Sequence, residues 1–440
     1  MPETVATVET NLQKDPQPIP QEADTADAIK KAPTPSKPRP RSLGIPFGIF
    51  TPGPLNAITD VPGVSVGQIT LEDNDKGIHT GVTAIRPHEG NVFLEKVPAG
   101  IFLGNGFGKM TGFAQVRELG NLETPIVLTN TLAVGPALKG LVDWTLAQPG
   151  CEAIKSVNGV VGETNDGRVN AIRECVITPD HVRAALDVAN AGPIDEGCVG
   201  AGTGTVAFGY KAGIGSASRV LPENCGGWHV GVLVQANFGG ILTVSGVPVG
   251  LELGGWPCEK ELGQTPEAQR MKSLLGTSIE TADGSIMMVV ATDAPLDARN
   301  CRRLAERAFM GMTRTGGVAS NGSGDFAIAF STAPSVRVHH ESTNLLEGAP
   351  TVRNDAMTPL FMAAIEATEE AIINALFAAH AVTTTDGTMY EALPIEKVLA
   401  LLRAHGVIER PKAESEAKAP QQKDASSWFA KAFEFFKGRN

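Results

Sequence analysis

The sequence predicts a globular protein built as an α/β or α+β sandwich, in which layered sheets are covered by helices. Two observations predict this class. Short apolar runs bounded by Gly, Asn, Asp or Thr have the length of buried strands, and longer amphipathic segments with start and stop signals have the length of helices. With 440 residues and 42% apolar side chains, the chain can bury a sizeable core in one large or two ordinary domains.

The predicted elements lie between about residues 43 and 410. The clearest strands are 126–128, 230–234, 286–290 and 326–330. One predicted helix runs from Asp297 to about Met312. A second runs to about His380, with Thr358 as its cap and Pro359 as its first helical residue, and a third covers 394–405 and stops at Gly406.

Both ends of the chain have a different composition. Residues 1–42 are rich in proline and poor in large apolar side chains, which predicts a disordered extension. Residues 411–425 form a polar linker, and 426–440 form a short amphipathic helix with Trp428, Phe429 and Phe433 at helical spacing. We expect this helix to dock on protein rather than on a membrane, because few basic residues accompany the aromatic side chains.

Charge and cysteine usage exclude several classes of function. The net charge of -11 and the lack of a basic cluster argue against a nucleic-acid partner. The six cysteines and eight histidines lack metal-ligand spacing, so no metal site is predicted, and the cysteines are interpreted as small buried apolar residues. No membrane-spanning run or hydrophobic signal segment is found, which predicts an intracellular, cytoplasmic protein.

Two glycine-rich stretches, 104–108 and 200–204, imitate a dinucleotide-binding fingerprint. That fingerprint requires a preceding strand, a helix that opens at the last glycine and an acid about 20 residues later. Neither stretch supplies this context, since 206–210 after the second one favours a strand. Close backbone packing is therefore the preferred interpretation, and no cofactor is predicted.

A hydroxyl nucleophile remains to be found. A Ser-His-Asp triad stays open, although no GxSxG elbow marks its serine. Alternatively, a serine at a chain terminus can use its own α-amine as base, since that amine has a pKa of roughly 7.7 to 8.0. Among several Gly-Ser and Gly-Thr pairs, Gly284-Ser285 is favoured because it follows a polar stretch, 277–283, and directly begins the predicted strand 286–290. An ordinary turn serine is the alternative.

Several long motifs settle between these alternatives: ITDVPGVSVGQ, GNGFGKMTG, VVGETNDG, GAGTGTVAFGYKAGIGSASR, ADGSIMMVVATDAPL and ASNGSGDFAIAFST. On these motifs, residues 44–406 resemble the family of L-aminopeptidase/D-amidase-esterases and β-peptidyl aminopeptidases, which is related to the ornithine acetyltransferase fold. The resemblance implies an α+β fold with an αββα sandwich of N-terminal-nucleophile type. It also implies self-cleavage between Gly284 and Ser285, with α-chain residues 43–284 and β-chain residues 285–410 forming the catalytic domain.

The resemblance assigns a role to each remaining site residue. Asn237 matches an asparagine that holds the oxyanion, and Ser323 and Asp325 match a serine and an acid that orient the nucleophile and its amine. Glu163 matches an acid that pairs with the free amino terminus of a substrate. Asn165 stands where D-amidase-type members carry a tyrosine, so substrate preference cannot be carried over from any one member.

The implied function is hydrolysis of small peptides, amides or esters from their amino end, through an acyl-enzyme on Ser285. The resemblance also implies a homo-oligomer, a tetramer of αβ units. Two rivals remain. One is an acyltransferase of the related fold, whose nucleophile is normally threonine, and the other is a binding scaffold that is never processed.

Overall fold

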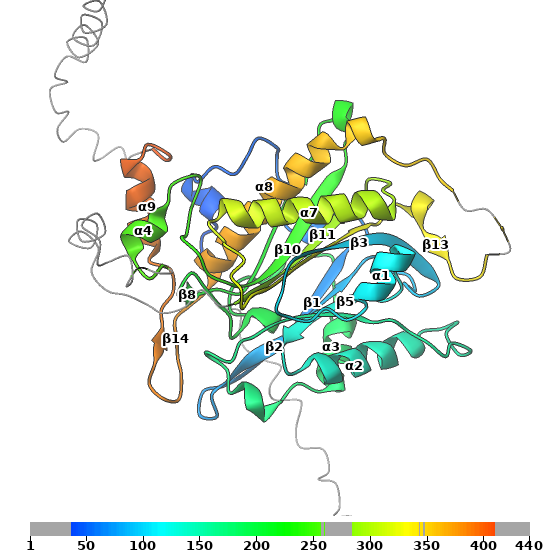
Figure 1. Ribbon diagram of the computed structural model, residues 1–440, viewed down its shortest axis with the longest axis horizontal. Helices are drawn as coiled ribbons and strands as arrows, with labels where there is room; N and C mark the ends of the chain where they lie inside the picture. The colour runs from blue at the N-terminus through cyan, green and yellow to red at the C-terminus, as the bar shows by residue number, and fades with distance from the viewer. Residues whose placement is uncertain (1–36, 257–258, 260–283, 343, 346–347, 410–440) are drawn as a thin grey trace, which may run out of the picture. The chain divides into compact units, whose positions relative to one another are not determined.

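The computed structural model describes residues 37–256, 259, 284–342, 344–345 and 348–409. Two β-sheets lie face to face, and helices cover the outer face of each sheet (Figure 1). Helices α7 and α8 pack on the larger sheet, and helices α2 and α3 pack on the smaller one. The predicted αββα sandwich and α+β class are therefore confirmed.

The larger sheet has the strand order β13-β3-β12-β11-β10-β9, with β4 paired to β3. Neighbours are antiparallel except β11 and β12, which are parallel. Its strands are β3 (Glu95–Gly106), β4 (Asn121–Leu122), β9 (Ile214–Val220), β10 (His229–Asn237), β11 (Ser285–Thr292), β12 (Gly324–Ser331) and β13 (Val338–His339).

The smaller sheet has the order β1-β2-β5-β6, with β5 and β6 parallel. Its strands are β1 (Ser65–Asp73), β2 (Ile78–Arg86), β5 (Ile126–Asn130) and β6 (Val160–Thr164). Two hairpins complete the strands, β7 (Val206–Ala207) with β8 (Tyr210–Lys211) and β14 (Val382–Thr383) with β15 (Met389–Tyr390).

The described α-helices are α1 (Phe113–Leu119), α2 (Val134–Leu146), α3 (Pro179–Asp187), α4 (Val249–Leu253), α7 (Ala298–Arg314), α8 (Thr358–Ala378) and α9 (Ile395–Ala404). Short 3-10 turns are η1 (Pro40–Leu43), η2 (Ile58–Asp60), η3 (Ile172–Glu174), η4 (Gly200–Gly202), η5 (Glu223–Cys225), η6 (Pro334–Val336) and η7 (Asn354–Ala356). Within the described residues, no helix is long and apolar enough to cross a membrane.

Strand β11 shows how the layers share one core. Its side chains alternate between the two faces of the sheet, as those of any strand do. Met288 and Val290 pack toward α7 and α8, whereas Met287 and Val289 pack between the two sheets. Because both faces are covered, the strand is apolar from Ile286 to Ala291 and is buried along its whole length.

The four predicted strands and three predicted helices are confirmed, and the structure extends most of them by a few residues. Asp297 caps α7, since its side chain accepts a hydrogen bond from the Asn300 main-chain N–H at 2.7 Å. The predicted cap of α8 is wrong. Met357 occupies the cap position without a side-chain hydrogen bond, and Thr358 is already helical.

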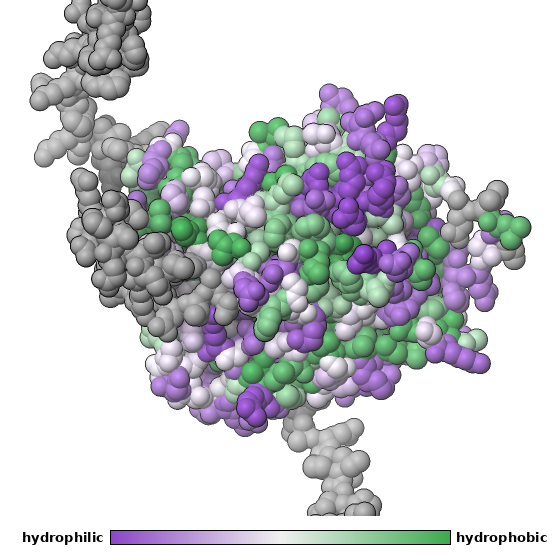
Figure 2. All heavy atoms as spheres, viewed as in Figure 1, coloured by the Kyte–Doolittle hydropathy of each residue, from purple (hydrophilic) through white to green (hydrophobic). Residues whose placement is uncertain are grey.

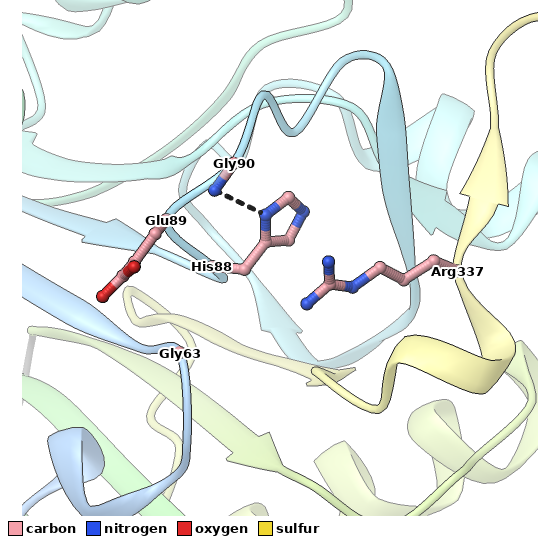
Figure 3. A pocket seen from close by; sticks show the side chains of 5 residues that line it. All are labelled: Gly63, His88, Glu89, Gly90 and Arg337. Atoms are coloured by element: carbon pink, nitrogen blue, oxygen red, sulfur yellow. Dashed lines mark hydrogen bonds between the residues drawn. The ribbon is translucent and has the colours of Figure 1, made fainter.

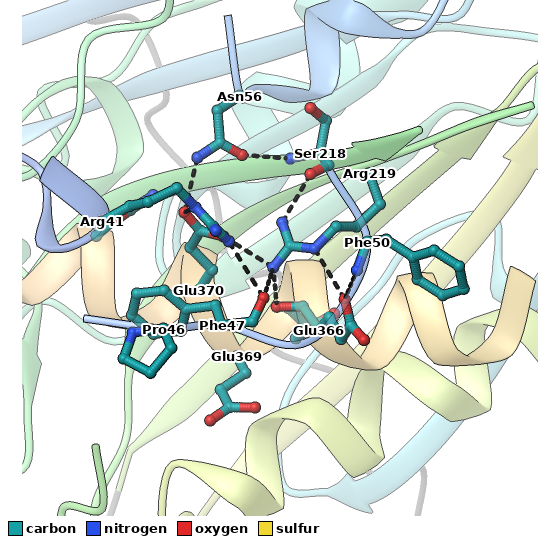
Figure 4. A network of polar contacts seen from close by, with 12 residues as sticks. Arg41, Pro46, Phe47, Phe50, Asn56, Ser218, Arg219, Glu366, Glu369 and Glu370 are labelled. Carbon is teal, nitrogen blue, oxygen red and sulfur yellow. Dashed lines mark hydrogen bonds and ion pairs between the residues drawn. The ribbon is translucent and has the colours of Figure 1, made fainter. Parts of the chain in front are cut away.

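A buried ionic network fastens the first described segment to the sandwich (Figure 4). Arg219 on β9 pairs with Glu366 at 3.1 Å and with Glu370 at 2.8 Å, both on α8. Arg41 reaches the same Glu370 carboxylate at 2.6 Å, and Asn56 donates to it at 2.7 Å. These contacts satisfy charges that are buried among apolar side chains.

Residues 37–42 differ from the predicted extension, because they pack on the body. Lys37 Nζ donates to the Ala379 carbonyl at 2.5 Å, and Arg39 pairs with Glu196 at 2.8 Å. The basic side chains between the prolines thus find buried acceptors. The rest of the extension, the linker 411–425, the aromatic helix 426–440 and the polar stretch 277–283 lie outside the described residues.

The cysteines are only partly as predicted. Cys151, Cys198 and Cys301 are buried, but Cys175 is exposed and Cys225 is half-buried. Cys175 ends a 3-10 turn with a positive φ, where its side chain has no core to enter. Cys258 lies outside the described residues.

Candidate active site

The ends of several strands meet at one edge of the larger sheet. Asn237 ends β10 and lies directly opposite Ser285, which begins β11. Ser285 in turn lies beside Gly324, the first residue of β12. The register of β12 against β3 shifts next to Asp325, and such irregularities often re-aim side chains at sites. This edge therefore gathers the residues that the sequence selects for catalysis.

Ser285 is held at the start of a buried strand and is only 5% exposed. Its Oγ accepts a hydrogen bond from the Gly324 main-chain N–H at 3.1 Å. The preceding residue has no room for a side chain, since a Cβ on Gly284 would lie 2.1 Å from the Asn237 carbonyl oxygen. Close approach of two strand ends thus requires glycine before this serine.

The Asn237 side chain is fixed by a hydrogen bond at each end. Its Oδ1 accepts from the Val206 main-chain N–H at 3.0 Å, and its Nδ2 donates to the Asn165 carbonyl at 3.0 Å. This pattern defines which end of the amide is the donor. Because an amide nitrogen carries two hydrogens, one of them remains for an oxygen bound at this edge.

Ser323 and Asp325 form a buried pair beside Ser285. The Ser323 hydroxyl donates to Asp325 Oδ1 at 2.6 Å, and Asp325 is completely buried. Burial raises the pKa of Asp325 to about 6, although the hydrogen bond from Ser323 opposes the shift. The second carboxylate oxygen, Oδ2, has no hydrogen-bond partner among the described residues. This acid is poised to accept a proton or a cation.

Glu163 is the penultimate residue of β6, next to the same edge, and is 2% exposed. Its Oε1 accepts the main-chain N–H of Lys109 at 2.9 Å and pairs with the Lys109 ammonium at 3.2 Å. A Cβ on Gly108 would touch both this Oε1, at 3.4 Å, and Gly324 Cα, at 2.9 Å, so the carboxylate lies close to the Ser285 neighbourhood. An ammonium group already occupies one face of Glu163.

Asn165 contributes its main chain rather than its side chain. Its carbonyl accepts from Asn237, while its side-chain Oδ1 accepts from the Gly167 N–H at 2.9 Å and closes a local turn. At this position the chain therefore supplies a main-chain carbonyl that holds the Asn237 amide.

The sequence alone did not identify the buried polar residues that hold the main chain around Asn237 and Asn165 in place. The completely buried Lys211 donates to the carbonyls of Thr203, at 3.0 Å, and Thr205, at 2.6 Å, just before the Val206 N–H that fixes Asn237. Desolvation lowers the pKa of Lys211. Asp166, next to Asn165, accepts from Thr80 at 2.6 Å, and burial raises its pKa to about 6.

A surface pocket lies at the other end of these strands, lined by Gly63, His88, Glu89, Gly90 and Arg337 (Figure 3). Both ring nitrogens of His88 are engaged, with the Glu95 carbonyl at 2.8 Å and the Gly90 N–H at 3.1 Å. Arg337 pairs with Glu95 at 2.8 Å. These groups serve local structure. Across the described residues, no cluster of three His, Cys, Asp or Glu side chains is arranged to hold a metal ion.

Comparisons with known proteins place this architecture. The β-peptidyl aminopeptidase BapA of Sphingosinicella microcystinivorans is 41% identical over 379 residues, covering 84% of this chain and 92% of that protein. A β-aminopeptidase from Burkholderia sp. has a TM-score of 0.73 at 40% identity, covering 85% of this chain and 100% of that chain. The L-aminopeptidase D-Ala-esterase/amidase of Ochrobactrum anthropi, a variant of the Ntn hydrolase fold, has a TM-score of 0.73 at 36% identity, covering 84% and 100%.

The fold and the polar sheet edge thus define a hydrolase of the N-terminal-nucleophile fold class. The family model of peptidase family S58 matches residues 56–390, which is most of the chain. The chain belongs to this family of aminopeptidases, and the resemblance seen in its motifs is confirmed.

Proposed function

We propose that the chain is a self-processing serine aminopeptidase and amidase, which cuts itself between Gly284 and Ser285. The observation that carries this proposal is the position of Ser285. It is the first residue of a buried strand and has the Ser323–Asp325 pair beside it. The residue before it must be glycine, because a Cβ there would clash with the Asn237 carbonyl. The cut yields an α chain that ends at residue 284 and a β chain that begins at 285.

In the mature enzyme, the freed α-amine of Ser285 takes the hydroxyl proton as Oγ attacks the substrate carbonyl. The Asn237 amide donates to the oxyanion, and one preorganised donor of this kind contributes roughly 3 to 4 kcal/mol to the chemical step. The Asp325 carboxylate stabilises the ammonium form of the amine. Water then releases the acid from the Ser285 ester.

The amino end of the substrate binds Glu163, which explains a preference for a free terminal amine. Lys109 occupies this carboxylate in the described structure, and its side chain is 53% exposed. Since an exposed lysine side chain reorients easily, the substrate ammonium replaces the Lys109 ammonium on binding. Small peptides, amides and esters are the proposed substrates.

We also propose a homo-oligomer of αβ units, following the tetramer implied by the family resemblance. Exposed large apolar side chains support it, because soluble monomers seldom gather many of them. Figure 2 shows apolar side chains below α7, around α1 and α2. Exposed apolar side chains in or next to these two helices are Leu119 of α1, Leu132 just before α2, and Leu146 of α2.

The proposal is tested by the intact mass of the purified protein. We expect wild type to give two polypeptides, 1–284 and 285–440, and Ser285→Ala to give one uncut chain. Ser331→Ala is the matched control, since Ser331 ends β12 and its hydroxyl donates to the Ala294 carbonyl, away from the site. It should be cut like wild type.

Activity is then measured on L-, D- and β-aminoacyl p-nitroanilides. Cut wild type should release p-nitroaniline from at least one of them, and Ser285→Ala from none. An uncut wild type with full activity would overturn the scheme. A cut protein that passes the acyl group to added amines but not to water would favour an acyltransferase.

A further inference from the structure

The main-chain N–H of Gly324 lies between two oxygen atoms that react in self-cleavage. It is 3.1 Å from Ser285 Oγ and 3.2 Å from the carbonyl oxygen of Gly284. The first is the attacking atom, and the second becomes negatively charged when the tetrahedral intermediate forms. No other described N–H is shared by these two atoms.

We propose that the Gly324 N–H is the oxyanion donor of the self-cleavage step, separate from the Asn237 amide that acts on substrates. This inference rests on the proposed cut between Gly284 and Ser285. As the reaction advances, the hydrogen bond shifts from Oγ, which loses its lone-pair density to the new bond, to the Gly284 oxygen, which gains charge.

The step balances as an N-to-O acyl shift followed by hydrolysis. Ser285 Oγ bonds to the Gly284 carbonyl carbon, and the C–N bond to Ser285 breaks. The hydroxyl proton passes, by way of the neighbouring Asp325 carboxylate, to the departing nitrogen, which becomes the α-amine. One water then cleaves the ester, leaving a carboxyl group on Gly284 and a hydroxyl on Ser285.

The geometry around Gly324 keeps this donor fixed. A Cβ on Gly324 would lie 2.8 Å from Gly108 Cα and 2.9 Å from the Phe107 carbonyl oxygen, so only glycine fits. The end of β3 also forms hydrogen bonds with the turn that precedes Gly324. The Phe107 N–H donates to the Ser323 carbonyl at 3.1 Å, and Asn105 donates to the Ser320 carbonyl at 2.9 Å. A donor held in this way needs no reorganisation during the reaction.

The test removes this single hydrogen by replacing Gly324 with glycolic acid, which turns its amide into an ester without adding a side chain. Cleavage is followed by mass spectrometry from a freshly made full-length chain. We expect the rate to fall about 100-fold or more. The matched control is the same replacement at Gly406, whose N–H donates to the Arg403 carbonyl at 3.1 Å at a helix end. It should be cut at the wild-type rate.

If the Gly324 ester variant is cut at a rate within about threefold of wild type, the inference is overturned. The proposed function still stands in that case, provided that wild type is cut and Ser285→Ala is not. If wild type is never cut, the proposed function fails first. Should the ester variant fold poorly, Asn105→Ala decides. Asn105→Ala should slow cleavage about tenfold. Its melting temperature, measured in the uncut Ser285→Ala protein, should stay nearly the same as that of Ser285→Ala alone. An unchanged cleavage rate again overturns the inference.

Discussion

Glu370 and Asp325 are both completely buried carboxylates, but their surroundings differ. Burial alone raises the pKa of Glu370, yet the hydrogen bond from Arg41 and the charge of Arg219 outweigh it and leave that pKa below its ordinary value. Asp325 has only the Ser323 hydroxyl, and burial raises its pKa to about 6. Glu370 is neutralised by guanidinium groups, whereas no compensating charge lies near Asp325 among the described residues.

The difference between the two surroundings favours Asp325 as the buried acid of the proposed reaction. Replacing a buried, neutralised ion pair by apolar packing often changes stability little, whereas an uncompensated buried carboxylate costs stability. In the proposed scheme, the cut converts the Ser285 amide into an amine. Its ammonium form then supplies the positive charge that Asp325 lacks in the uncut chain.

The largest expected effect comes from removing a charge from the buried network of Arg41, Arg219 and Glu370. Glu370→Gln leaves the buried Arg219 short of one negative charge, so we expect a loss of roughly 3 to 5 kcal/mol in the free energy of unfolding, measured with urea. Self-cleavage of the folded protein should stay normal. Glu118→Gln is the control, since it removes an exposed pair with Arg117 and should change stability by less than about 1 kcal/mol. Equal losses in both variants would refute the comparison.

Asp325→Asn should have the opposite pattern, a slower reaction without a loss of stability. We expect self-cleavage and p-nitroanilide hydrolysis to slow about 100-fold, equivalent to about 2.7 kcal/mol in the barrier, because the carboxylate is lost. Stability at pH 7 should be equal to wild type or higher, since no charge has to be buried. Glu370→Gln provides the contrast, with lower stability and a normal rate. A destabilised Asp325→Asn variant that cuts at the normal rate would assign Asp325 to structure.

The smallest effect is a pH dependence of the uncut chain. Folded Asp325 keeps its proton up to about pH 6, whereas the ordinary pKa of the residue is 3.8. Its contribution to stability is therefore complete below about pH 4 and is lost as pH rises through 6. Relative to Ser285→Ala/Asp325→Asn, Ser285→Ala should lose on the order of 2 kcal/mol between pH 4 and 7. Parallel unfolding curves for the two variants would show that Asp325 titrates normally.

The sequence selected the candidate site residues, but it did not identify the buried residues that hold them in place. Ser285 was favoured because a polar stretch, a glycine and an apolar strand follow one another, and the family resemblance then selected it; the structure places it at the start of β11. Asp297 was identified as a helix cap for a similarly local reason. Thr358 was misjudged, because Pro359 fits the second helical position as well as the first.

Arg219 and Gly324 escaped prediction because their roles depend on partners distant in the sequence, and Lys211 because a lysine is expected at the surface. A charged residue in a glycine-rich or apolar stretch is expected at the surface, and only the packing of α8 on β9 reveals that Arg219 is buried. Gly324 is one of 49 glycines, and its importance comes from the end of β3, more than 200 residues earlier in the chain.

The order of strands in the larger sheet sets the fate of the two proposed fragments. β11 and β12 belong to the second fragment but lie between β10 and β3 of the first. Maturation therefore leaves the assembled sheet intact, since the β11–β12 pair of the second fragment is hydrogen-bonded to the first fragment on both sides. Once the mature protein is denatured, however, regaining the fold becomes a bimolecular reaction, so recovery should depend on concentration where the precursor's does not.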